Sequence, residues 1–101
     1  MQIKGLSQNE ENIIKSILQP YKDEYSFYYY GSRVKGDFRF LSDLDLMIKG
    51  NTTVQTDFIN DLKDKLDKSN LSFAVNISDF YNLDEHFYKL IEQDLVKVDL
   101  N

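Results

Sequence analysis

Two aspartates, Asp43 and Asp45, alternate with leucines at the start of a segment, 43–48, that has the pattern of a β-strand. Side chains two positions apart on a strand lie on one face, with their Cα atoms about 6.5–7 Å apart, so both carboxylates can reach the same cation. Mg²⁺ suits this arrangement, because proteins commonly hold it with one or two carboxylates and the phosphates of a substrate. Without a cation, two like charges this close disfavour each other. The pair therefore predicts a Mg²⁺ site.

A candidate phosphate-binding segment precedes the aspartates. Gly31 and Ser32 directly follow a predicted aromatic strand. A glycine at such a junction lets backbone N–H groups approach a phosphate closely, and the serine adds a hydroxyl donor. Arg33, Lys35 and Arg39 then put three cations within seven residues, available for a triphosphate or a leaving pyrophosphate. Each feature alone is also common in ordinary turns and on surfaces, but their combination in this order favours a nucleotide site.

The elements around these residues predict one α/β domain covering residues 1–101. Ser7 and Glu10 have the spacing of a capping box, and the helix that they begin is expected to end near Gln19, before Pro20. The other predicted elements are strands at 26–30, 43–48 and 71–78, a helical turn within 31–36, a helix at 53–68, a helix beginning with Asn82 and Glu85, and a terminal segment, 95–100, that continues this helix or forms a short strand. We expect most of the tyrosines at 28–30 to pack inside the domain. This order predicts an α/β sandwich with a small mixed sheet and helices over one face.

Composition limits the classes of function. The chain has 101 residues, no cysteine and a formal net charge of -5. The absence of cysteine is typical of a cytoplasmic protein, and the absence of a long apolar run argues against a membrane span. The negative charge argues against direct binding of a nucleic-acid backbone. A free nucleotide is compatible with it, because Mg²⁺ can neutralise the phosphates while carboxylates hold the metal.

The two segments together resemble a known signature. The stretch from Gly31 to Gly36 (GSRVKG), followed after five residues by Ser42 to Leu46 (SDLDL), is similar to the G-S-x-x-x-G and S-D-x-D-L motifs of the DNA polymerase β-like nucleotidyltransferases. The shortness of the chain resembles the minimal nucleotidyltransferases of prokaryotes, which are commonly encoded beside a HEPN-domain toxin. The resemblance extends from about the first helix to the end of the chain.

The resemblance implies a set of site residues and a reaction. The nucleotide would contact Gly31, Ser32, Arg33, Lys35 and Ser42, while Asp43 and Asp45 would bind two Mg²⁺ ions when ATP is present. Family members paired with a HEPN toxin transfer AMP from ATP to a tyrosine of that toxin. The implied function is therefore that of an antitoxin that adenylylates its partner within a hetero-oligomer.

One expected residue is missing. The family usually supplies a third carboxylate from a later strand, and the matching position here is Asn76. An amide oxygen can bind a metal, but it carries no charge and cannot act as a base at neutral pH. The chain is then a natural variant with weak or no transfer, a form substituted to trap a substrate complex, or a protein in which Asp79 takes over. A regular strand would put Asp79 on the opposite face. The alternative function is a catalytically impaired nucleotide-binding subunit that neutralises or regulates its partner by contact.

Overall fold

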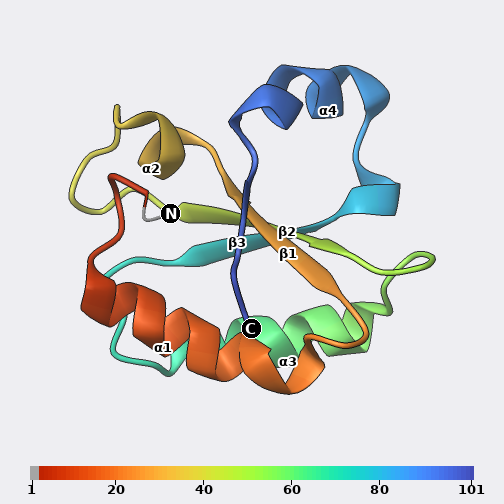
Figure 1. Cartoon of the computed structure of the whole chain (residues 1–101), viewed down its shortest axis with the longest axis horizontal. Coiled ribbons are helices and arrows are strands. Elements are labelled where there is room, and N and C mark those ends of the chain that lie inside the picture. Colours follow the sequence, from red (N-terminus) through yellow and green to blue (C-terminus); the bar gives the residue numbers. More distant parts are fainter. Residues whose placement is uncertain (1–2) are drawn as a thin grey trace.

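The computed structural model of the chain describes residues 3–101 as four α-helices, three short 3₁₀ turns and four strands (Figure 1). In chain order these are α1 (Gln8–Leu18), η1 (Gln19–Tyr21), β1 (Ser26–Tyr30), α2 (Ser32–Lys35), β2 (Leu44–Lys49), α3 (Thr56–Asp67), β3 (Val75–Asp79), η2 (Phe80–Asn82), α4 (Glu85–Ile91), η3 (Glu92–Asp94) and β4 (Val96–Lys97). Within these residues no helix is both long and apolar enough to cross a membrane.

The strands form one mixed sheet in the order β3-β2-β1-β4. The central strand β1 is antiparallel to both β2 and β4, whereas β2 and β3 run parallel to each other. A parallel pair needs a crossover connection, and α3 provides it between β2 and β3. The mixed sheet and the α/β class predicted from the sequence are confirmed.

The core lies between one face of the sheet and the helices α1 and α3 (Figure 1). Alternate residues of β1 and β2, such as Phe27, Tyr29 and Leu46, point into it and are buried. Helix α1 contributes Ile14 and Leu18. The expectation of helices over one face holds for these two helices, while α4 stands on the opposite side of the sheet. The second face of the sheet carries the other alternate residues of the strands, including Asp45 of β2 and Asn76 of β3.

Local sequence signals explain where the first elements begin and end. The capping box is confirmed: the Glu10 N–H donates to Ser7 Oγ at 3.2 Å, and the Ser7 N–H donates to Glu10 Oε1 at 2.9 Å. The α-helix ends at Leu18, and Pro20 lies in the following 3₁₀ turn. The predicted helical turn after β1 is α2, and the glycines on either side of it have φ values of 85° and 95°.

Several predicted boundaries were wrong, and the helix predicted at 53–68 begins only at Thr56. The third strand begins at Val75 rather than at 71, because its parallel partner β2 begins only at Leu44, which pairs with Val75. In the segment before it, Phe73 instead packs its ring against Arg33. Helix α4 is capped by Asp84, whose side chain accepts from the Phe87 N–H, and not by Asn82. The terminal segment contains the short strand β4, so it does not continue the helix.

Candidate functional site

Asp43, Asp45 and Asn76 meet on the second face of the sheet. Asp43 immediately precedes β2, Asp45 is its second residue, and Asn76 is the register partner of Asp45 on the parallel strand β3. The Asn76 Nδ2 donates to Asp43 Oδ2 at 3.0 Å. Since a carboxylate can only accept, the amide must turn its nitrogen toward Asp43. The two strands therefore bring together the two predicted metal ligands and the residue at the position of the third carboxylate.

Asp45 is the more buried of the two carboxylates, and its surroundings change its acidity. Burial raises the pKa of Asp45 above the usual value of 3.8; the hydrogen-bonding Asn76 amide opposes this, and the charge of Asp43 raises the pKa further. Asp43, by contrast, is exposed. Ionising both carboxylates is thus electrostatically costly when no cation is present, which is the property predicted for a pair of metal ligands.

Gly31 allows the turn after β1 to approach Asp45 closely. Its φ of 85° lies in the region that favours glycine, and a Cβ added there would collide with Asp45 Oδ2. The following helix α2 begins at Ser32, where the first backbone N–H groups have no preceding turn to supply acceptors. The glycine therefore puts these N–H groups next to a carboxylate that could hold a cation, a suitable arrangement for a metal-bound phosphate.

Arg33 occupies a different environment from the one expected for a phosphate ligand. Its side chain is buried, with 4% of its surface exposed, and burial lowers the pKa of its guanidinium. Nε donates to the Ser42 carbonyl at 2.8 Å, Nη1 to the Gly5 carbonyl at 2.6 Å and Nη2 to the Phe40 carbonyl at 2.8 Å. The guanidinium also lies 3.9 Å from the centre of the Phe73 ring. With its donors used in this way, Arg33 fixes the segment that leads to Asp43.

The other predicted nucleotide-binding residues surround the same turn. Ser32 opens α2 with a half-buried side chain. Lys35 is exposed and lies 4.0 Å from Asp94, a weak surface ion pair that leaves its ammonium accessible. Ser42 Oγ accepts from the Arg39 N–H at 2.8 Å, and the Ser42 N–H donates to the Arg39 carbonyl at 3.0 Å. Ser42 thereby closes the turn directly before Asp43.

A hydroxyl pair beside the carboxylates was not predicted. Tyr30 Oη and Ser78 Oγ lie 3.0 Å apart, and Tyr30 is the register partner of Asp45. Burial raises the pKa of Tyr30, the hydrogen bond to Ser78 opposes this, and the charge of Asp45 adds to the increase. The sequence signal was the shared strand face of Ser78 and Asn76, two residues apart. The expected packing of the tyrosine strand holds for Tyr29 and Tyr30, which are buried.

Asp79 does not replace the missing carboxylate. It is buried on the opposite face of β3, as a regular strand requires. Its Oδ2 accepts from the Val54 N–H at 2.8 Å and its Oδ1 accepts from the Tyr81 N–H at 3.1 Å. These two bonds hold the start of η2 and the segment before α3, so Asp79 has a structural role.

The donor set is compatible with Mg²⁺ bound together with a nucleotide. Two carboxylates and the amide oxygen of Asn76 are hard oxygen donors, and Mg²⁺ normally completes its shell with phosphate oxygens and water. Among residues 3–101, no three acidic, histidine or cysteine side chains gather as a metal site. The third residue beside Asp43 and Asp45 is an amide, Asn76, which is not one of these side-chain types. A site of this kind needs the phosphates of its substrate to hold the ion firmly.

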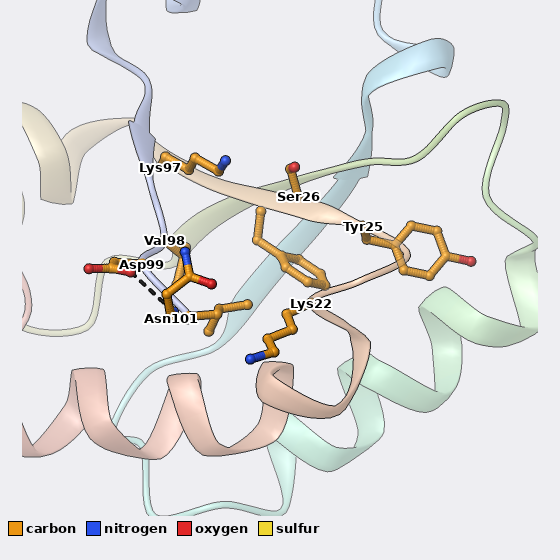
Figure 2. Close-up of a pocket in the computed structure, with 9 residues that line it drawn as sticks. Lys22, Tyr25, Ser26, Lys97, Val98, Asp99 and Asn101 are labelled. Atoms are coloured by element: carbon orange, nitrogen blue, oxygen red, sulfur yellow. Dashed lines mark hydrogen bonds between the residues drawn. The ribbon is translucent and has the colours of Figure 1, made fainter.

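The described surface also has a hollow away from these residues. A cavity of about 200 Å³ lies at the start of β1 and is lined by residues such as Lys22, Ser26 and Lys97 (Figure 2). The chain end closes one side, where the Asn101 N–H donates to Asp99 Oδ1 at 3.1 Å. None of the candidate site residues lines this cavity, because they lie at the opposite end of β1.

Comparison with known proteins agrees with this geometry. Residues 12–98 match the model of the family described as "Polymerase beta, Nucleotidyltransferase". The chain is also similar to the "Probable protein adenylyltransferase MntA" of Haemophilus influenzae, with 31% identity over 93 residues, which cover 92% of this chain and 82% of that protein. The matched region contains both the Gly31 turn and the carboxylates on β2. The chain therefore belongs to the polymerase beta nucleotidyltransferase family.

Proposed function

We propose that this chain is an adenylyltransferase that transfers AMP from Mg²⁺-bound ATP to a hydroxyl group of a protein. The observation that carries the proposal is the close approach of the Gly31 turn to Asp45, beside Asp43, in a chain of this family. The name of the relative, a protein adenylyltransferase, supports ATP as donor and a protein as acceptor. The exposure of Asp43 and Asn76 supports a protein acceptor too, because a hydroxyl on another molecule can reach them.

Each residue has a defined part in the proposed reaction. Gly31 and Ser32 bind phosphate through backbone N–H groups and a hydroxyl, and Lys35 adds a cation. Asp43 and Asp45 hold Mg²⁺, which when bound neutralises charge on the phosphates. The acceptor oxygen bonds to the α-phosphorus and its proton passes to solvent water. The bond from the α-phosphorus to the oxygen that bridges to the β-phosphorus breaks, and pyrophosphate leaves with that electron pair. We assign Arg33 and Ser42 to support of this segment, since all three guanidinium nitrogens of Arg33 donate to protein carbonyls and Ser42 Oγ accepts from the Arg39 N–H.

The acceptor that we propose is a tyrosine of a HEPN-domain toxin. The support for this acceptor is the resemblance of the two sequence motifs to minimal nucleotidyltransferases that act on such partners, and the relative's name supports a protein as acceptor. In this proposal the chain is an antitoxin, and it binds its partner in a hetero-oligomer. The accessible position of the carboxylates is compatible with a tyrosine presented by a protein surface.

A second candidate function follows from Asn76. Its amide donates to Asp43 where a carboxylate would share the metal, and it cannot accept the proton of the attacking hydroxyl. The proton must therefore leave to solvent, which removes the advantage of a positioned base. The second candidate is a subunit that binds nucleotide, turns over slowly or not at all, and controls its partner by contact.

One labelling experiment separates the two candidates. The purified chain and its HEPN-domain partner are incubated with Mg²⁺ and ATP labelled at either the α- or the γ-phosphate. Adenylyl transfer predicts a labelled partner from α-labelled ATP and none from γ-labelled ATP. An unlabelled partner in a stable complex that still binds ATP supports the second candidate. Absence of ATP binding contradicts both.

The variant Asn76→Asp measures the contribution of the missing carboxylate. A positioned general base typically accelerates a reaction by about 10²–10⁴-fold, so we expect the variant to transfer AMP at least about 100-fold faster at similar ATP affinity. The matched control is Asn51→Asp, which adds the same charge at an exposed position outside the site. Equal transfer rates for the chain with Asn76 and for Asn76→Asp would refute a catalytic deficit at this position.

A further inference from the structure

Helix α4 is unusually poorly covered by the rest of the chain. It has seven residues, none of them buried. Helices shorter than about 12–15 residues are marginal in water and depend on packing of an apolar face. The ring contacts that α4 makes are those of Phe87 with Tyr30, at 6.1 Å between centroids, and of Tyr88 with Phe80, at 5.2 Å. Leu90 remains 70% exposed and Phe87 40% exposed. The apolar face of α4 is therefore only partly buried by the rest of this chain.

The position of α4 connects this face to the candidate site. Phe87 packs on Tyr30, which is the register partner of Asp45 and directly precedes Gly31. Figure 1 shows α4 on the side of the sheet opposite α1 and α3. This is the side on which Asp45 and Asn76 lie, because Phe27 and Tyr29 point the other way into the core. A protein bound to α4 would thus lie beside the carboxylates.

The charge around α4 defines what kind of surface fits it. Residues 84–94 contain four acidic residues and one lysine, so this segment carries -3 of the formal net charge of -5. The lysine, Lys89, lies 3.8 Å from Glu85, and Lys35 of α2 lies 4.0 Å from Asp94. The Lys89–Glu85 pair is exposed and the Lys35–Asp94 pair is partly exposed, so both have a small energetic value. The neighbouring site adds Asp43 and Asp45. The face is therefore apolar in part and negatively charged.

We propose that α4, with its exposed Phe87 and Leu90, is the docking element for the acceptor protein, through an apolar patch surrounded by basic residues on that protein. This inference rests on the proposed function, because it assigns α4 to the protein that presents the hydroxyl. A second copy of this acidic chain and an anionic membrane surface are disfavoured by like charge. A basic surface on the acceptor protein is attracted by the negative charge of residues 84–94. Binding there would bring the acceptor hydroxyl toward the carboxylates.

A second exposed apolar pair offers a matched control. Phe40 and Leu41 lie in the loop before β2 and are 77% and 70% exposed. Leu41 and Leu90 thus have the same exposure. The loop pair follows a cation, Arg39, whereas α4 is bordered by acidic residues. Substitution of each leucine by glutamate should leave folding unchanged, which circular dichroism and thermal unfolding verify.

The experiment measures binding of the separately purified HEPN-domain partner to the natural chain and to Leu90→Glu, Leu41→Glu and Glu92→Lys. We expect Leu90→Glu and Glu92→Lys to weaken binding by about 10-fold or more, and Leu41→Glu by less than about 2-fold. Raising NaCl from about 50 to 500 mM should also weaken binding by about 10-fold. Equal effects of the two leucine variants, tighter binding at high salt or no binding at low salt would overturn the proposal. A dimer of the natural chain that dissociates in Leu90→Glu, seen by sedimentation, would also overturn it.

Failure of this proposal can be told apart from failure of the proposed function. ATP binding and AMP transfer are measured with the same proteins. A partner that binds through Leu90 but is never labelled supports docking on α4 and contradicts the transfer reaction. A partner that is labelled equally by the natural chain and by Leu90→Glu, at subsaturating concentration, supports transfer and contradicts docking on α4.

Discussion

Replacing Asn76 by aspartate should destabilise the metal-free protein. In the present chain the Asn76 amide donates to Asp43 Oδ2 at 3.0 Å, and the variant would replace this bond with two facing carboxylates. At about 3 Å in a solvent-exposed setting, the repulsion of two unit charges is about 1 kcal/mol, and the lost hydrogen bond adds a similar amount. We expect a loss of roughly 1–2 kcal/mol, reduced by side-chain rotation. For a domain of this size that corresponds to a Tm lower by about 5–10 °C.

The assay is thermal unfolding in EDTA and in Mg²⁺, with Asn51→Asp as the charge-matched control. In EDTA, Asn76→Asp should melt below both the natural chain and the control. Millimolar Mg²⁺ should raise its Tm more than theirs, because an ion that binds only the folded state stabilises it by mass action. Equal melting of Asn76→Asp and the control in EDTA, or no added response to Mg²⁺, would refute the assignment of residue 76 to the metal site.

Three further predictions follow from the site. Gly31→Ala should destabilise the protein by about 1–2 kcal/mol and weaken ATP binding, because the added Cβ would collide with the Asp45 carboxylate. In the control Gly36→Ala the added Cβ would contact the Lys4 side chain instead. This control should lose a similar amount of stability in thermal unfolding, and calorimetry should show no loss of ATP binding. Arg33→Lys should cost about 2–4 kcal/mol in urea unfolding, since an ammonium cannot bond to three separate carbonyls, one buried and two partly buried, as the planar guanidinium does. An unchanged midpoint would contradict the structural role of Arg33. The pKa of Asp45 is raised in the folded state. Between the usual value of about 3.8 and this raised pKa, the folded chain therefore holds a proton that the unfolded chain has lost. The contribution of Asp45 to stability falls as the pH rises through this range. Asp45→Asn should remove that decrease and be the more stable protein at neutral pH in EDTA, which unfolding measured across pH will check.

Local signals in the sequence were sufficient for much of the fold. The capping box of Ser7 and Glu10 determines the start of α1, and the two glycines around α2 mark its single turn. The alternation of Asp43 to Leu46 predicted correctly that Asp45 points away from the core. These predictions depend on contacts between residues near in sequence, for which spacing alone is informative.

The differences involve residues far apart in sequence. The apolar alternation at 71–78 suggested a strand along its whole length, but a strand exists only where β2 offers a partner, from Val75 onward. Arg33 has the spacing of a phosphate ligand, yet Gly5 and Phe73, distant in sequence, enclose its guanidinium. The Tyr30–Ser78 pair likewise depends on strand order, which composition and spacing do not determine.

In the proposed reaction, the turn at Gly31 and Ser32, together with Asp43 and Asp45, binds a metal-bound nucleotide. The most direct measurement is calorimetric titration of the isolated chain with ATP, in Mg²⁺ and in EDTA, repeated with Asp45→Asn. We predict one ATP per chain in Mg²⁺, with binding lost in EDTA and strongly weakened in Asp45→Asn. Equal ATP affinity in Mg²⁺ and EDTA, or in the natural chain and Asp45→Asn, would contradict the account.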